Sequence, residues 1–504
     1  MARLTFLVLE QLSAVLFLCV SFTGAHFCRT VPGDPSFPSG EEWDGLNSSI
    51  SGRLVKAIPS AQFCDTHGGC TDAEWTSASF RADIPGAMNF GNVPLYAILA
   101  ESVEDVQIAV AFSSTHNLRL AVKASGHDLL GRSTARDSLL ISTHKFQNIT
   151  FAENFTVSGR DEGSAVTVGS GVPLNTLYQA AKEQGKILVG GVAATVVAAG
   201  GYIQGGGYSM LSPLLGLAAE NVLEFEVVTA NSTYLKVNEK QNTDLFWALR
   251  GGGAGSWGVI VSATFRTFTT FNATISQVSI VANDTVAIGS IIATHAKHIF
   301  DWDDLHVGQF FTADAHTLSL VSYFPRISSD AAAAAALKPF LDDAEEFGQI
   351  VEQQFNEVNI NDGVTEVDDV AGSNSVVGSR LIPANAYRDH PDAFGHVYTQ
   401  LLDAGAAAVL GLLVAGGKVS ENARIDSAIH PAWRTAKTHI AGSPGAAYSN
   451  EADSLEEDFK TTFFGPNYPR LEDIKRRYDP KDLFIVAAGV RSDKWDKDGL
   501  CRVD

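Results

Sequence analysis

Basic residues are scarce relative to acidic ones in this chain of 504 residues. Lys and Arg number 36 against 57 Asp and Glu, which gives a formal net charge of −21. Such a balance argues against nucleic acid or an anionic membrane as a partner. Long apolar runs are also missing after the N-terminus, so no membrane-spanning helix is expected. With 45% hydrophobic and 18% charged residues, the composition is typical of an ordered globular protein. The length of 504 residues is typical of two or three domains.

Cysteine is rare as well, with five in the whole chain. Residues 1–25 are typical of a signal peptide, with Arg3 at the positive start, a short apolar run and the small residues Thr23-Gly24-Ala25 at the cleavage site. Removal of this segment would take Cys19 with it. An even number of cysteines then remains in an oxidising, secreted context. We expect Cys64 to pair locally with Cys70, and Cys28 to join Cys501.

A zinc site is the alternative for these cysteines, but the paired short spacings of zinc ligands are lacking, so no metal is expected. Export is also consistent with six Asn-x-Ser/Thr sequons, at which we expect glycosylation. They are headed by Asn47, Asn148, Asn154, Asn231, Asn272 and Asn283.

The hydrophobic pattern predicts an α+β fold rather than an even alternation of strands and helices. Helices are expected over 94–118, 173–184, 243–250, 332–348 and 393–408. Strands are expected over 118–122, 139–142, 165–168, 222–228, 259–265, 278–281 and 318–323. We expect a loop-rich segment at 26–85, a ligand-binding domain at 86–270, a second domain at 271–440 that covers it, and a C-terminal segment at 441–504.

Glycine clusters carry the main functional signal. The first stretch is Ser125-Gly126-His127-Asp128 followed by Gly131-Arg132-Ser133, at the end of an expected strand. Gly190-Gly191 and the run Gly200-Gly201-x-x-x-Gly205-Gly206-Gly207 come next, and Gly251 to Gly258-Val259-Ile260 follows. Glycine lets the backbone approach a ligand closely, and successive N–H groups can hold pyrophosphate. Three such clusters with a histidine indicate a large, planar, phosphorylated ligand; tight turns between buried strands are the alternative.

The segment Gly253-Ala254-Gly255-Ser256-Trp257-Gly258 also matches the dinucleotide fingerprint GxGxxG. That fingerprint requires a strand before it, a helix after it and an acidic residue about 20 positions later. Here an expected helix precedes the glycines and an expected strand follows. NAD bound to a Rossmann domain is therefore not expected.

Taken together, these motifs resemble the FAD-linked oxidases of the vanillyl-alcohol-oxidase type, and most of all their berberine-bridge-enzyme-like branch in fungi. The C-terminal run Phe464-Gly465-x-Asn467-Tyr468-x-Arg470-Leu471 and the later Tyr478-Asp479-Pro480 carry the same resemblance. It implies a two-subdomain FAD-binding domain of the PCMH type, to which the C-terminal segment returns, and a substrate domain built from an antiparallel sheet and helices.

The resemblance also implies that FAD is bound by the glycine clusters and attached covalently through His127. Some members of the family attach the flavin a second time, through a cysteine in the loop before the Gly200-Gly201 pair. Ala194 occupies that position here. We therefore expect attachment through His127 only.

For catalysis, the resemblance places Tyr448 over the flavin, and Glu451 or Asp453 is an alternative base, with Asn450 contacting flavin or substrate. The expected activity is an oxidase that takes a hydride from an alcohol or a secondary metabolite and passes electrons to O2, giving H2O2. A carbohydrate oxidase and a secreted, non-catalytic FAD-binding module are the alternatives. A monomer is expected, and no motif identifies the substrate.

Overall fold

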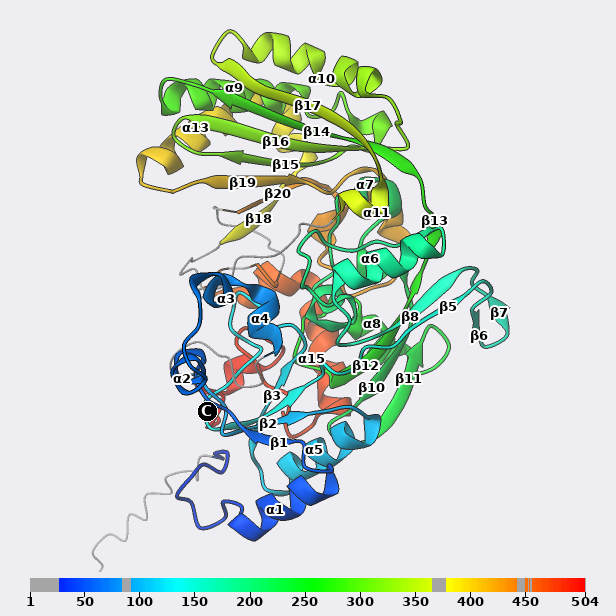
Figure 1. The fold of residues 1–504 in the computed structure, drawn as a ribbon, viewed down its shortest axis with the longest axis vertical. Helices are drawn as coiled ribbons and strands as arrows, with labels where there is room; N and C mark the ends of the chain where they lie inside the picture. Colours follow the sequence, from blue (N-terminus) through cyan, green and yellow to red (C-terminus); the bar gives the residue numbers. More distant parts are fainter. Residues whose placement is uncertain are drawn as a thin grey trace, which may run out of the picture.

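The computed structural model describes residues 27–83, 92–364, 378–441, 449–451, 453 and 456–503. The predicted signal peptide and Tyr448 lie outside these residues. Among the described helices, none combines the length and the apolar character needed to cross a membrane. Figure 1 shows a lower body built on two sheets and an upper body built on one large sheet.

A small mixed sheet with the order β1-β2-β4-β3 forms the first part of the lower body. The central strand β4 runs parallel to both β2 and β3. Helix α5 (Val103–Thr115) connects β2 to β3 and begins in a capping box formed by Ser102 and Asp105. The four strands are β1 (Leu54–Lys56), β2 (Tyr96–Leu99), β3 (Arg119–Lys123) and β4 (Ser138–Ser142).

Two expectations for this part were wrong. The helix predicted over 94–118 is a strand, β2, followed by the shorter α5, because a short continuous apolar run does not by itself distinguish a strand from a helix. The segment predicted to be loop-rich contains four short helices, two of which start in capping boxes at Ser39 and Thr71. They are α1 (Gly40–Ser49), α2 (Ser60–Thr66), α3 (Asp72–Thr76) and α4 (Ala78–Asp83).

A five-stranded antiparallel sheet with the order β11-β10-β12-β8-β5 forms the second part of the lower body. Its strands are β5 (Ile149–Ala152), β8 (Ala165–Gly169), β10 (Val222–Val228), β11 (Tyr234–Asn238) and β12 (Val259–Arg266). The helices α6 (Leu174–Glu183), η1 (Ala198–Tyr202), α7 (Ser212–Leu215) and α8 (Thr243–Leu249) accompany it. Since α8 precedes the GxGxxG segment and β12 follows it, this segment lacks the strand-before, helix-after order of the dinucleotide fingerprint.

The upper body is a seven-stranded antiparallel sheet with the order β17-β14-β16-β15-β19-β20-β18. Figure 1 shows α9 (Thr285–His298), α10 (Asp330–Ala344) and α13 (Pro391–Asp403) on the face that points away from the lower body. The strands are β14 (Asn272–Val281), β15 (Gly308–Ala313), β16 (Thr317–Pro325), β17 (Gln349–Asn359), β18 (Ser379–Pro383), β19 (Val409–Leu413) and β20 (Ala436–Ala441). The predicted substrate domain thus has the expected architecture.

The C-terminal segment returns to the lower body through α15 (Tyr468–Tyr478). The buried ammonium of Lys475 donates hydrogen bonds to the carbonyl oxygens of Ser256 at 2.7 Å and Phe484 at 2.6 Å, and to Asp479 Oδ2 at 2.6 Å. The two predicted disulfides, Cys64–Cys70 and Cys28–Cys501, are present. Cys28–Cys501 joins the first described residues to the last.

Hydrophobic packing ties the bodies together. One core cluster combines the five-stranded sheet with Leu412, Trp433 and Phe464 from later parts of the chain. A second cluster lies between the seven-stranded sheet and its helices, and a third lies beneath α5. Buried side chains from both bodies therefore share one core at their junction.

The predicted sequons differ in exposure. Asn148, Asn154, Asn231, Asn272 and Asn283 are exposed, whereas Asn47 is partly buried and accepts a hydrogen bond from the Leu54 N–H at 3.1 Å. Asn272 donates through its side-chain amide to Glu357 at 3.0 Å. Glycosylation stays a prediction at all six.

Candidate functional site

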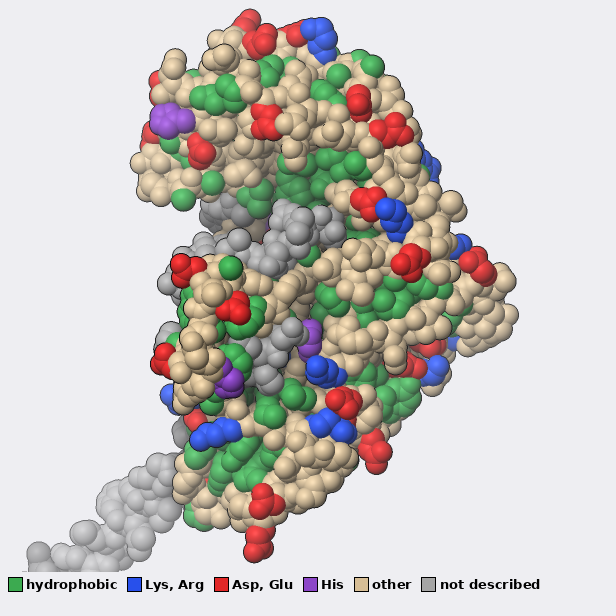
Figure 2. Space-filling model, viewed as in Figure 1, with side chains coloured by type: hydrophobic (Ala, Val, Ile, Leu, Met, Phe, Trp, Pro, Cys, Tyr) green, Lys and Arg blue, Asp and Glu red, His purple; other side chains and the backbone are tan. Residues whose placement is uncertain are grey.

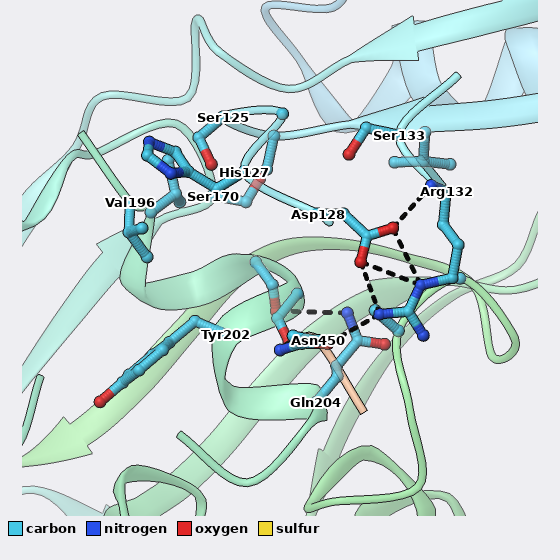
Figure 3. Close-up of a pocket in the computed structure, with 18 of the residues that line it drawn as sticks. Ser125, His127, Asp128, Arg132, Ser133, Ser170, Val196, Tyr202, Gln204 and Asn450 are labelled. Atoms are coloured by element: carbon cyan, nitrogen blue, oxygen red, sulfur yellow. Dashed lines mark hydrogen bonds and ion pairs between the residues drawn. The ribbon is translucent and has the colours of Figure 1, made fainter. Parts of the chain in front are cut away.

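A cavity of about 280 Å³ lies where the small mixed sheet, the glycine-rich segment and the C-terminal return meet. The residues that line it fall mainly within four stretches of the chain, 122–133, 193–204, 254–260 and 450–451, with Thr143 and Ser170 between them. Figure 3 shows part of this wall. Figure 2 shows one face of the molecule, in the orientation of Figure 1. Segments separated by more than 300 positions thus contribute to one pocket.

The loop after β3 carries the histidine. Gly126 and Gly131 have φ angles of +97° and +74°, a backbone conformation that side chains other than glycine rarely adopt. These turns let the loop fold back over the end of the strand. The ring of His127 lines the cavity, with Nε2 2.5 Å from Thr195 Oγ1. In Figure 3 the ring and the Asp128 carboxylate point in opposite directions from the loop.

A hydrogen-bond network joins the loop to the rest of the site. The guanidinium of Arg132 donates to Asp128 Oδ1 at 2.6 Å and to Asn450 Oδ1 at 2.9 Å. Asn450 in turn donates to the carbonyl oxygen of Gly201 at 3.0 Å. These hydrogen bonds therefore fix the positions of three distant segments of the chain around the cavity (Figure 3).

Several buried polar atoms in the wall point to a polar ligand. Arg132 Nη1, Ser170 Oγ and Gln204 Oε1 have no hydrogen-bond partner among the described residues. Leaving such groups unpaired costs roughly 1–3 kcal/mol each, so a ligand that satisfies them binds favourably. A guanidinium suits a phosphate, whereas a hydroxyl and an amide oxygen suit ribityl or ribose hydroxyls. The residues present therefore fit FAD.

Glycine also allows the close packing that the wall requires. A Cβ at Gly258 would lie 2.6 Å from the carbonyl oxygen of Val228, and one at Gly200 would lie 3.1 Å from the Cβ of Ala124. The contact at Gly258 is too short for any residue with a Cβ. A side chain at Gly258 would displace β10 from β12 and deform the cavity wall.

The carboxyl group of Glu451 also faces the cavity. Tyr208 Oη donates a hydrogen bond of 2.7 Å to its Oε1, and His439 Nδ1 lies 3.7 Å from its Oε2. Burial raises the pKa of Glu451 to about 7, against which the Tyr208 hydrogen bond acts. Burial also lowers the pKa of His439 to about 3, so this imidazole is neutral near pH 7. Glu451 can therefore exchange a proton near neutral pH.

The structure brings many of the predicted residues together. Those that line the cavity are Ser125, Gly126, His127, Asp128, Arg132, Ser133, Gly200, Gly201, Gly258, Ile260, Asn450 and Glu451. Those that do not line it are Gly131, Gly190, Gly191, Gly205, Gly206, Gly207 and Val259. A Cβ at Gly190 would lie 2.5 Å from Tyr178 Oη, and one at Gly207 would lie 2.9 Å from Ala218 Cβ. These two glycines serve close packing behind the wall.

Sequence reasoning missed several residues of the site, namely Thr143, Ser170, Thr195, Tyr202, Gln204, Tyr208 and His439. Signals existed for some of them. Tyr202 and Gln204 fall inside the glycine-rich motif, and Tyr208 follows it directly. Thr143 and Ser170 each follow directly after a strand. His439 lies within β20, and nothing in its local sequence marks it.

Comparisons with known proteins agree with this geometry. Residues 94–238 match the family model described as FAD binding domain, and residues 447–491 match the model described as berberine and berberine like. An uncharacterized FAD-linked oxidoreductase of Arthroderma benhamiae is 33% identical, over 97% of this chain and 99% of the relative.

Two solved structures extend the comparison. The VAO-type flavoprotein MtVAO615 of Myceliophthora thermophila is 28% identical, covering 95% of this chain and 100% of its own, with a TM-score of 0.84. A glucooligosaccharide oxidase of Acremonium strictum, described with a 6-S-cysteinyl, 8α-N1-histidyl FAD, is 18% identical over 88% of this chain and 98% of its own, with a TM-score of 0.68. At that identity, the second structure supports the fold alone. The chain therefore belongs to the FAD-linked oxidoreductases of the vanillyl-alcohol-oxidase and berberine-bridge-enzyme-like family.

Proposed function

We propose that this FAD-linked oxidoreductase is an oxidase that removes a hydride from an alcohol or secondary-metabolite substrate and passes the electrons to O2, giving H2O2. The observation that carries the proposal is that one cavity is lined by both His127 and Glu451. The first is a candidate for holding the cofactor, and the second is a candidate for handling a proton.

FAD, when bound, supplies the hydride acceptor. We propose that it is attached through His127 only. Ala194 is fully buried next to Thr195 and offers no sulfur for a second bond. Arg132 would hold a phosphate, and Ser170 and Gln204 would hydrogen-bond polar groups of the cofactor.

Glu451 is proposed as the group that receives the proton from the substrate. In its ionised form it accepts a proton either directly from the substrate hydroxyl or through the phenol of Tyr208, with which it shares a 2.7 Å hydrogen bond. The neutral His439 beside it does not hold Glu451 ionised, and so the carboxyl group keeps a pKa that suits a base at neutral pH. Tyr448, three positions earlier, remains a second candidate.

The proposed division of the chain is a FAD domain at 86–270, a substrate domain at 271–440 and a C-terminal segment at 441–504. The start of the seven-stranded sheet at Asn272 supports the boundary near 270, whereas β1 extends the FAD domain to residues before 86. The two disulfides favour a secreted or secretory-lumen location. We propose a monomer.

The decisive experiment is an anaerobic mixing assay on purified protein. Alcohols, phenolic metabolites and oligosaccharides are added in turn, and bleaching of the oxidised flavin absorbance is followed, with H2O2 measured after air is admitted. An alcohol or metabolite that bleaches the flavin and releases H2O2 supports the proposal. Bleaching by oligosaccharides alone would support the carbohydrate oxidase, and a flavin that no substrate class bleaches would support the non-catalytic module.

A further inference from the structure

The hydroxyl group of Thr195 is fixed against the ring of His127, although 68 positions separate the two residues. Thr195 lies in the loop between β9 (Lys186–Ile187) and η1, and its side chain is buried. The backbone on either side is pinned to the start of α6, since Leu174 N–H donates to Val196 O at 2.8 Å and Asn175 N–H donates to Ala194 O at 3.1 Å. A β-branched side chain on such a backbone has few rotamers. The hydroxyl therefore has a defined position.

We propose that Thr195 is the positioning residue that prepares His127 for covalent attachment of the flavin, an inference that rests on the attachment in the proposed function. A neutral imidazole carries its proton on one nitrogen, and the hydrogen bond at that nitrogen selects the tautomer. By accepting a hydrogen bond from Nε2–H, the Thr195 hydroxyl leaves the lone pair on Nδ1, on the other side of the ring. Nδ1 is then the nucleophile.

The overall step balances with dioxygen as the oxidant. A bond forms between His127 Nδ1 and the 8α methyl carbon of the flavin, which loses one C–H, while the imidazole loses its Nε2 proton. The two electrons and two protons released reduce one O2 to H2O2. Thr195 contacts the nitrogen from which one of these protons leaves.

A second cavity gives that proton a way out. It has a volume of about 340 Å³ and is lined by Thr195, His144 and Thr176, among others. Ser125 and Val197 line both cavities, whereas Thr195 lines only the second. Thr195 thus stands between the His127 ring and a hollow with room for water. A proton can pass from Nε2 through the hydroxyl to that water.

The test compares Thr195→Val, Thr195→Ala and Thr195→Ser in the full-length protein. Each purified variant is denatured, and flavin that stays on the polypeptide is separated from flavin that is released; their sum reports whether the variant folds and binds FAD. A time course with added FAD gives the rate of attachment. We expect the Val and Ala variants to attach flavin about 10- to 100-fold more slowly, as when a histidine loses its orienting hydrogen bond at a metal site. The Ser variant should match the wild type.

Thr176→Val is the control, because it makes the same chemical change at a second, more exposed threonine that lines this cavity. Wild-type attachment rates in the Val and Ala variants would overturn the inference and leave the proposed attachment standing. Slow attachment in the Ser variant would overturn it as well, since Ser keeps the hydroxyl. If the Val variant does not fold, the smaller Ala variant decides. Wild-type protein without covalent flavin, or covalent flavin in His127→Ala, would instead refute the proposed attachment itself.

Discussion

Tyr208 and Glu451, 243 positions apart in the chain, share a hydrogen bond of 2.7 Å beside the cavity. Tyr208 directly follows the glycine-rich motif, and Glu451 belongs to the C-terminal return. Each is held by its own segment, so their contact exists only when the C-terminal segment has docked on the FAD domain. The proton-handling group of the proposed oxidase is thus assembled from two segments that are distant in the sequence.

Glu451→Gln should slow substrate oxidation by about 10²- to 10⁴-fold, the usual contribution of a general base. The amide cannot accept the substrate proton, but it keeps the size of the side chain. Anaerobic flavin reduction in a stopped-flow instrument measures the effect, with flavin content per chain as the control. An unchanged reduction rate at normal flavin content would rule out Glu451 as the base.

The reduction rate should rise with pH through about 7, because Glu451 must be ionised to accept a proton and burial raises its pKa to that value. Tyr208→Phe removes the hydrogen bond that lowers this pKa. The midpoint of the profile should therefore move to higher pH in the variant. The pH profiles of the reduction rate are compared between the wild type and Tyr208→Phe. An identical midpoint would show that Tyr208 does not affect the titrating group.

The stability of the fold should also depend on the ionisation of Glu451, but it should decrease with rising pH, whereas the reduction rate increases. The pKa of Glu451 is raised above its ordinary value of 4.5, so the folded protein binds the proton more tightly than the unfolded chain. This contribution is fully present below pH 4.5 and is lost as the pH rises through about 7. Glu451→Gln should remove this loss, so its melting temperature should fall less between pH 5 and 8 than that of the wild type, as checked by thermal melts across this range.

Arg132→Met should weaken FAD binding. The substitution removes the unpaired Nη1 donor and the link from Asp128 to Asn450. A hydrogen bond to a charged group is worth about 1.5–3 kcal/mol, so the affinity should fall roughly 10- to 150-fold. Fluorescence titration in a His127→Ala background measures it without covalent attachment. Arg136→Met is the control, because Arg136 is exposed and its guanidinium pairs with the neighbouring Asp137; equal losses in both variants would contradict the assignment.

Lys475→Met should destabilise the protein by about 3–5 kcal/mol, because it leaves Asp479 buried without its partner. The neighbouring Arg476→Ala breaks an exposed pair with Glu472 and should cost about 0–1 kcal/mol. Urea unfolding followed by flavin or tryptophan fluorescence compares the two. Similar midpoints for both variants would show that the buried pair does not secure the C-terminal segment.

The sequence predicted the glycine-rich wall because backbone requirements are local. A turn such as that at Gly126 requires a glycine at the very position that makes it, and so the loop that carries His127 could be recognised from its own residues. Gly190 shows the limit of this reasoning. Its missing Cβ makes room for Tyr178, so this glycine is required by packing. The sequence alone does not distinguish a glycine required by packing from one that contacts a ligand.

The partners of Glu451 could not be predicted for a different reason. Tyr208 and His439 meet it only through the docking of the seven-stranded sheet and the C-terminal return, and no periodic pattern encodes that docking. The same holds for Thr195, which reaches His127 from a separate loop. Residues that act through tertiary contacts are not marked by any pattern in the sequence around them.

The bond between Cys28 and Cys501 has a consequence for biosynthesis. A ribosome delivers Lys475 and Cys501 after the FAD and substrate domains have emerged. A chain interrupted before residue 450 lacks Asn450 and Glu451, so its cavity wall is incomplete. Because the bond spans 473 positions, it can form only after the segments that build both bodies have been synthesised.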